Sequence, residues 1–125
     1  MEEVRSGREL ATSFAGLLEE ERCRDVAVLD VRGLTDLCDY MVLATGLNRP
    51  QMKAAMARLE EESREWGAAP LPAPDHSTER WMTADYIDVT VHLFSEEARG
   101  YYDLELIWGD AGRVDFRSAA TRTNT

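Results

Sequence analysis

The chain has 125 residues, a length that suits one domain, and 44% of them are hydrophobic, which is enough to build a core. Its formal net charge is −10, which argues against general binding to nucleic acid backbones, because such binding needs clustered lysine and arginine. The same charge is compatible with a basic protein partner.

The sequence contains no recognisable targeting or membrane-spanning segment. The first ten residues are charged and lack the apolar core of a signal peptide, and no window approaches the roughly 20 apolar residues of a membrane span. We therefore expect a cytoplasmic protein. Cys23, Cys38 and the two histidines lack the spacing of a metal site, so we expect reduced thiols and no bound metal.

The first quarter of the chain predicts a helix and a strand. Ser6 and Glu9 have the spacing of a capping box, which opens a helix. Apolar residues then recur at helical intervals and form one stripe, made of Leu10, Phe14, Leu17 and Leu18. Residues 25–31 follow as a strand, whose continuous apolar middle predicts burial on both faces and a central place in the sheet.

A second strand and a second helix follow. Residues 39–46 read as a buried strand that ends at a glycine. Asn48 suits a helix cap, and Pro50 is tolerated in the first helical turn. The apolar face of this helix consists of Met52, Ala55, Met56 and Leu59. We interpret its methionines as core residues rather than as a binding groove, since methionine fills irregular gaps.

A strand pair is predicted next, after a proline-containing loop at residues 68–77. Residues 81–86 and 89–94 are rich in aromatic and β-branched side chains, and Ile87-Asp88 between them is the turn. Successive side chains of a strand point to opposite faces. In the second strand, Val89, Val91 and Leu93 therefore point one way, and Thr90, His92 and Phe94 point the other.

A third helix is predicted after the strand pair. Ser95 suits the N-cap, and Glu96 and Glu97 suit the first turn, where the helix dipole favours negative charge. Gly109 marks the end of this helix.

The predicted order of elements is helix, two strands, helix, two strands, helix. This order predicts a single α/β (α+β) domain in which a mixed β-sheet packs against helices. We place the domain at residues 1–110. Residues 111–125 are polar and rich in serine, threonine and arginine, so we expect them to form a flexible tail.

The strand pair and the third helix combine aromatic residues with carboxylates. Between residues 81 and 110 there are seven acidic residues and one basic residue, Arg99. Large aromatic side chains beside carboxylates are typical of a surface that docks on a basic partner, although the same composition fits an ordinary sheet and helix with a solvated acidic side. On the docking interpretation, the surface consists of Trp81, Asp85, Tyr86, Asp88, Glu96 and Glu97.

We find no convincing catalytic constellation. The turn at Gly46 before a helix could hold a phosphate, but neither a P-loop nor a dinucleotide-binding motif occurs. Asp36 and Asp39 could pair around a metal, and His92 could act as a general base. We favour the interpretation that Asp36 and Asp39 are solvated turn residues and that His92 is a hydrogen-bonded histidine, because no credible nucleophile lies near His92. The sequence around His76 gives little indication of a function. We expect no enzymatic activity and no cofactor.

Four segments of the chain resemble one known family. They are DVAVLDVRG at residues 25–33, DYMVLATG at 39–46, WMTADYIDVTVHLF at 81–94 and RGYYDLELIW at 99–108. In this order and spacing they resemble the ribosomal silencing factor family, also called Iojap-like. The chain departs from the family pattern at residues 47–50, at Pro74-Asp75, and at Ile87, where the family has a glycine.

The resemblance implies a mixed α/β domain shaped like nucleotidyltransferases but without their activity. It implies binding to large-subunit ribosomal protein fourteen, a basic protein on the intersubunit face, so that the small subunit cannot join and translation is repressed. It also implies a homodimer in the free state, and the net charge of −10 predicts little direct binding to nucleic acid. His92, Tyr102, Glu105 and Trp108 lie in the matching motifs and are secondary docking candidates.

Two other functions stay open at this stage. One is a nucleotidyltransferase-like enzyme. Such enzymes use a Gly-Ser turn and close-set metal-binding aspartates, whereas this chain has Gly46-Leu47 with no D-x-D after it. The other is a structural subunit that only dimerises.

Overall fold

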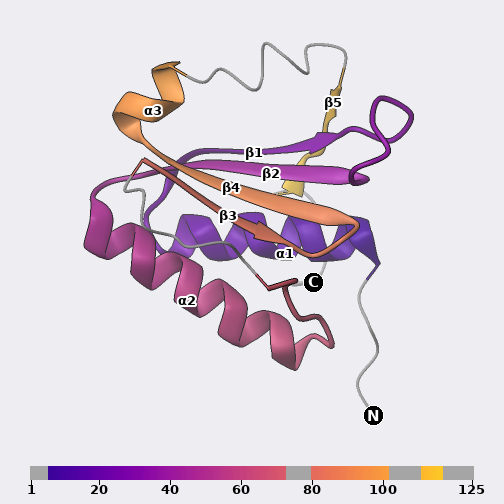
Figure 1. Ribbon diagram of the computed structural model, residues 1–125, viewed down its shortest axis with the longest axis horizontal. Coiled ribbons are helices and arrows are strands. Elements are labelled where there is room, and N and C mark those ends of the chain that lie inside the picture. Colours follow the sequence, from indigo (N-terminus) through magenta and orange to yellow (C-terminus); the bar gives the residue numbers. More distant parts are fainter. Residues whose placement is uncertain (1–5, 73–79, 102–110, 117–125) are drawn as a thin grey trace.

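The computed structural model describes residues 6–72, 80–101 and 111–116. The helices and strands in these ranges follow one another in the predicted order, with one added strand at the end (Figure 1). They are α1 (Gly7–Glu20), β1 (Arg24–Asp30), β2 (Tyr40–Gly46), α2 (Arg49–Glu65), β3 (Trp81–Asp85), β4 (Val89–Ser95), α3 (Glu96–Tyr101) and β5 (Gly112–Arg113).

The strands form one mixed sheet in the order β3-β4-β2-β1-β5. β2 and β4 pair in parallel, and the other neighbours pair antiparallel. A parallel pair needs a crossover connection, which α2 and β3 supply. The predicted mixed sheet is confirmed. Its centre is β2, every residue of which is buried, whereas β1 lies one strand further out, beside the short β5.

The helices cover the two faces of the sheet unequally, with α1 and α2 on one face and α3 on the other (Figure 1). The larger hydrophobic cluster lies on the α1–α2 side and includes Phe14, Leu59 and Val91. A smaller cluster on the α3 side includes Leu43 and Phe94. The alternation predicted for β4 is therefore confirmed, because neighbouring residues of that strand enter different clusters.

Both long helices begin at the predicted caps. The Ser6 hydroxyl accepts a hydrogen bond from the Glu9 amide at 3.2 Å, and the Glu9 carboxylate accepts one from the Ser6 amide at 3.0 Å. The Asn48 side chain accepts from the Gln51 amide at 2.9 Å. α2 ends before Gly67, whose φ of +81° lies in the left-handed region that glycine adopts without strain.

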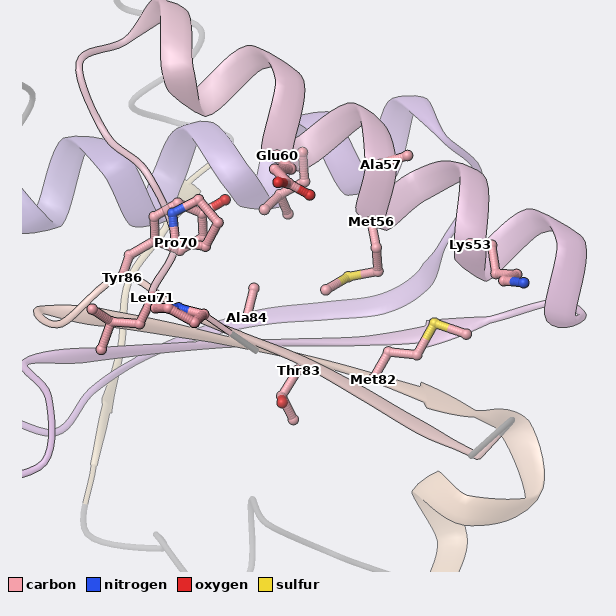
Figure 2. Close-up of a pocket in the computed structure, with 12 residues that line it drawn as sticks. Lys53, Met56, Ala57, Glu60, Pro70, Leu71, Met82, Thr83, Ala84 and Tyr86 are labelled. Carbon is pink, nitrogen blue, oxygen red and sulfur yellow. The ribbon is translucent and has the colours of Figure 1, made fainter. Parts of the chain in front are cut away.

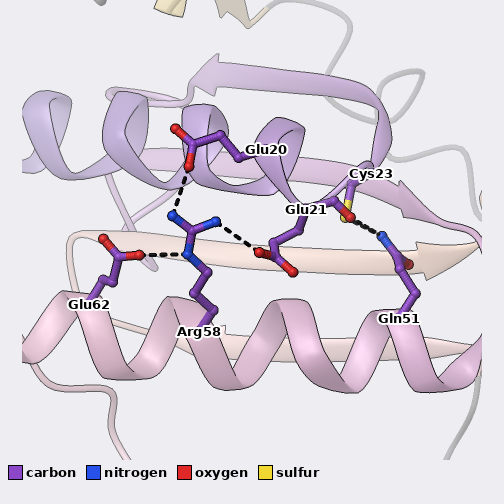
Figure 3. A network of polar contacts seen from close by, with 6 residues as sticks. All are labelled: Glu20, Glu21, Cys23, Gln51, Arg58 and Glu62. Atoms are coloured by element: carbon purple, nitrogen blue, oxygen red, sulfur yellow. Dashed lines mark hydrogen bonds and ion pairs between the residues drawn. The ribbon is translucent and has the colours of Figure 1, made fainter.

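A network of ion pairs joins α1 to α2 (Figure 3). The Arg58 guanidinium contacts Glu20 at 2.7 Å, Glu21 at 2.8 Å and Glu62 at 2.6 Å. Hydrogen bonds from Arg58 to these carboxylates, led by the bond to Glu21, raise the pKa of the guanidinium. Beside it, the Gln51 amide donates to the Glu21 carbonyl at 2.7 Å. Acidic residues at this contact are therefore paired within the chain.

The prediction that residues 111–125 form a flexible tail is wrong for residues 111–116. Gly112 and Arg113 pair with Asp30 and Leu29 of β1, and the Val114 amide donates to the Val28 carbonyl at 2.9 Å. Val114 and Phe116 are both buried. The flexible tail was predicted from the overall polar composition, which does not reflect these two apolar residues. Their burial holds the segment against the sheet.

The third helix is described only as far as Tyr101. The predicted helix end at Gly109 and the docking candidates Tyr102, Glu105 and Trp108 lie outside the described residues. Within the described ranges, none of the helices is long and apolar enough to span a membrane.

Candidate functional site

The β3–β4 hairpin ends in the predicted two-residue turn. The Tyr86 amide donates to the Val89 carbonyl at 2.8 Å, which closes the hairpin, and the Asp88 amide donates to the Tyr86 carbonyl at 2.9 Å. The Ile87 amide donates to the Asp85 carboxylate at 2.8 Å. Ile87 has a φ of +74°, a conformation that is rare for a β-branched residue. Three hydrogen bonds thus hold an unusual backbone in place.

The loop between β1 and β2 meets this turn at the same end of the sheet (Figure 1). The Asp88 carbonyl accepts hydrogen bonds from the Asp39 amide at 2.8 Å and the Tyr40 amide at 3.1 Å. The start of α1 also lies there, since a Cβ added at Gly7 would approach the Asp88 Cβ at 3.5 Å. The turn is therefore held by two other parts of the chain.

Exposed carboxylates and apolar side chains gather on these two connections. We call this set the hairpin-end surface, and it consists of Asp36, Leu37, Asp39, Asp85, Ile87 and Asp88. Burial raises the pKa of the Cys38 thiol, and the negative charges of Asp85 and Asp39 raise it further, which places both carboxylates near this thiol. None of the four carboxylates forms an ion pair with another described residue.

The predicted docking residues do not form one patch. Asp85 and Asp88 are exposed at the turn, whereas the exposed Glu96 and Glu97 begin α3 at the opposite end of β4. The seven residues of β4 separate the two groups by about 20 Å. Glu96 also pairs with Arg24 at 3.2 Å. The acidic residues therefore divide into a group at each end of the strand.

Tyr86, one of the residues of the predicted docking surface, is buried in the core instead of exposed. Its side chain is 7% exposed, its hydroxyl lies 2.9 Å from the Ser63 hydroxyl, and its ring centroid lies 4.6 Å from that of Phe14. Burial raises the pKa of the phenol. Met82, Ala84 and Tyr86 occupy alternate positions along the chain, so they share the face that points to the α1–α2 core.

Trp81 and His92 lie on the α3 side and bond to each other. The Trp81 indole N–H donates to His92 Nδ1 at 3.2 Å, and its ring centroid lies 5.1 Å from that of Phe94. Because indole only donates, His92 Nδ1 accepts, and we infer that Nε2 carries the proton and donates to Thr90 Oγ1 at 3.1 Å. Burial lowers the pKa of His92 to about 4. Both ring nitrogens are thus engaged, as expected for a structural histidine.

An apolar groove of about 340 Å³ lies between α2 and the edge strand β3 (Figure 2). Met56 and Met82 approach it from opposite walls, and Pro70 and Leu71 lie at one end. Met56 is thus only partly buried, whereas Met52 is in the core as predicted. Among the described residues, the lining of the groove includes Lys53 and Glu60 but no cysteine, histidine or serine, so it contains no nucleophile paired with a histidine base.

The other candidate sites have structural explanations. A side chain at Gly46 would overlap Met52, so the glycine allows α2 to pack closely against β2. The Leu47 amide is already bonded to the Gln51 side chain at 2.9 Å. Among the described residues, no group of three or more potential ligands is arranged to hold a metal ion. Cys23 and Cys38 are buried and not disulfide-bonded.

Two docking candidates were missed in the sequence and appear only in the structure. Leu37 is 79% exposed and Ile87 is 63% exposed, the largest values among the large hydrophobic residues described. A usable signal was present, because each is a large apolar residue within a predicted connection and is flanked by aspartates.

The comparisons with known proteins agree on one family. The profile described as "Ribosomal silencing factor during starvation" matches residues 4–125. The ribosomal silencing factor of Bacillus subtilis is 31% identical over 101 residues, which cover 81% of this chain and 86% of the relative. The chloroplastic protein Iojap of Arabidopsis thaliana is 27% identical over 106 residues, which cover 84% of this chain but 44% of that protein.

A solved structure shows the same fold. A crystal structure of a protein from Chromobacterium violaceum superimposes with a TM-score of 0.79 at 30% identity, and the match covers 84% of this chain and 88% of that one. Sequence and fold therefore agree over most of the length of both chains. The chain belongs to the ribosomal silencing factor family.

Proposed function

We propose that this chain binds the large ribosomal subunit through its ribosomal protein fourteen and prevents the small subunit from joining. Its family membership and the name of its bacterial relatives, ribosomal silencing factor, support an action on the ribosome. The observation that carries the choice of surface is the group of four unpaired carboxylates at the hairpin end. A basic ribosomal protein is the complementary partner.

Exclusion of the small subunit requires a firmly held surface rather than a chemical step. The turn meets this need, because the Asp88 carbonyl is bonded to both the Asp39 and Tyr40 amides. Exposed positions on a rigid scaffold are suited to recognition. The carboxylates steer the chain toward a basic partner and set its orientation, and the bulk of the bound domain then occupies the path of the small subunit.

We further propose that the chain has no catalytic activity and forms a homodimer when it is free. The engagement of both nitrogens of His92 supports the first statement. The second follows from the family resemblance alone. The finding that would overturn it is the mass of a single 14.1 kDa chain in light scattering at micromolar concentrations.

The test reverses charge at the hairpin end. The double variant Asp85→Lys/Asp88→Lys should weaken sedimentation with purified large subunits by about tenfold or more. It should also flatten the dependence of binding on salt, since salt screens exposed charge pairs. The control is Glu61→Lys/Glu65→Lys, which makes the same change in charge at two exposed positions of α2.

Circular dichroism establishes that both double variants are folded, and a light-scattering assay of subunit joining measures function. Loss of binding and of inhibition by the hairpin variant alone supports the proposal. If that variant binds and inhibits like the wild type, the docking surface lies elsewhere. The next candidates are then Glu96 and Glu97 at the start of α3.

A further inference from the structure

Exposed apolar side chains concentrate at the hairpin end of the sheet. Among the described residues, five large hydrophobic side chains are exposed. Leu34, Leu37 and Ile87 lie in the two connections at this end, and the Leu71 amide is bonded to the Asp85 carbonyl at 2.8 Å. Leu47, after β2, is the fifth and lies at the other end. Apolar exposure therefore coincides with the unpaired carboxylates.

Ile87 occupies a position that favours another residue. Its φ of +74° is suited to glycine, and a β-branched side chain there is strained. The side chain is 63% exposed, so the strain is not offset by burial in the core. A strained residue that its surroundings hold in place is an indication of a functional site. The turn therefore presents the exposed Ile87 side chain to solvent, where a partner can contact it.

Leu37 is presented by the neighbouring loop. Its amide is bonded to the Thr35 hydroxyl at 3.1 Å, and its neighbour Cys38 is buried. Two residues further on, the Asp39 amide is bonded to the Asp88 carbonyl. The loop is thus fastened to the turn that carries Ile87, which keeps the two apolar side chains at one end of the sheet.

We propose that Leu37 and Ile87 are the apolar anchors of the docking surface, and that the partner is a basic protein surface with an apolar recess. This inference rests on the proposed function and names the residues that supply its affinity. In protein interfaces a few central apolar side chains supply most of the affinity, whereas exposed charges around them mainly steer and specify. The aspartates on either side would form that charged rim.

The charges identify the partner. A second copy of this chain docked through the same surface would bring two sets of four carboxylates together, because a twofold interface pairs each patch with itself. Like charges oppose that arrangement. The carboxylates would also repel the negatively charged phosphates of an RNA backbone, which argues against RNA as the partner. A basic protein complements both the aspartates and the apolar side chains.

The experiment separates binding from stability. Ile87→Gly removes the anchor and relieves the backbone, so it should raise the melting temperature and yet weaken binding to purified large subunits by about tenfold or more. Ile87→Asn keeps a side chain that tolerates positive φ but is polar, and it should weaken binding similarly. Leu37→Ser should also weaken binding by about tenfold. The control is Leu47→Ser, which changes an exposed leucine at the other end of β2 and should bind like the wild type.

The readouts are sedimentation of the full chain with large subunits and thermal unfolding of each variant alone. Weaker binding by the variants of Ile87 and Leu37, with an unchanged Leu47→Ser, supports the anchors. If these variants bind at wild-type strength while Asp85→Lys/Asp88→Lys does not, the anchors are wrong and the proposed function stands. If the wild-type chain itself does not bind large subunits, the proposed function fails, and this inference fails with it.

Discussion

Two regions of this molecule use acidic residues in different ways. At the contact between α1 and α2, Glu20, Glu21 and Glu62 surround Arg58 at 2.6–2.8 Å, so three negative charges share one internal partner. At the hairpin end, four carboxylates are exposed and none forms an ion pair with a described residue. The first group holds two helices together. The second group is available to a different molecule.

This difference separates structural from functional charge in a strongly acidic chain. A net charge of −10 by itself indicates only that the partner is not an anion. On the proposed function, the unpaired carboxylates mark the docking surface, because charges that are already neutralised within the chain contribute little to attraction at a distance.

The largest effect is expected at Tyr86, which lies at the turn but packs in the helical core. Tyr86→Ala should lower the free energy of unfolding by about 3–5 kcal/mol, because it leaves a cavity beside Phe14. Tyr86→Phe should cost about 1 kcal/mol, since the Ser63 hydroxyl loses a partner. Urea denaturation measures both.

The binding of the folded phenylalanine variant completes this test. It should sediment with large subunits as the wild type does, because the Tyr86 hydroxyl faces the interior. If Tyr86→Phe keeps its stability but loses binding, the tyrosine belongs to the docking surface, and the division between the two regions is wrong.

Much of this architecture was predictable because it depends on local pattern. The capping box at Ser6, the cap at Asn48 and the turn at Ile87-Asp88 all follow from residues within four positions of each other, and all three are confirmed. The alternation along β4 also needed only the two-residue period of a strand. The same period, applied to Met82, Ala84 and Tyr86, would have predicted that Tyr86 is buried.

The pairing of charges was not predictable, because it depends on distant parts of the chain. Arg58 meets Glu20 and Glu21 only after the sheet has brought α1 and α2 together. The composition of β3, β4 and α3 indicated an acidic surface, but not that the length of β4 divides it. Val114 and Phe116 were missed since their burial depends on pairing with β1, far away in the sequence.

The second largest effect is expected from the pH dependence of stability, which tests the interior of the hairpin. The pKa of His92 is about 4 in the folded chain and about 6.5 when unfolded. Below pH 6.5 the unfolded chain takes up a proton that the folded chain does not, so stability falls as the pH falls toward 4. The loss attributable to His92 is at most about 3 kcal/mol.

The control for this titration is His92→Gln, which retains an acceptor for Trp81 and a donor for Thr90 but does not titrate in this range. Denaturant unfolding at pH 7 and pH 4.5 gives the free energy of each protein. The wild type should lose more stability between these pH values than the variant. Equal losses would mean that His92 is solvated, and that the bonds to Trp81 and Thr90 do not define its protonation.

The smallest effects are expected from variants that compare the two groups of carboxylates directly. Arg58→Met leaves Glu20, Glu21 and Glu62 close together without their cation, and it should lower the melting temperature by about 3 °C or more. Asp36→Asn/Asp39→Asn removes two charges that have no such partner. It should change the melting temperature by about 1 °C or less, or raise it slightly, because self-repulsion in the acidic chain decreases.

Arg64→Met is the matched control for Arg58→Met, because Arg64 also lies on α2 but, among the described residues, forms an ion pair only with Glu60 one turn away, at 2.9 Å on the exposed surface. Such a pair contributes little, so this variant should melt close to the wild type. Differential scanning calorimetry at low and high salt ranks the variants. If the paired aspartate variant melts as far below the wild type as Arg58→Met, the carboxylates at the hairpin end stabilise the fold. Their exposure would then no longer indicate a docking surface.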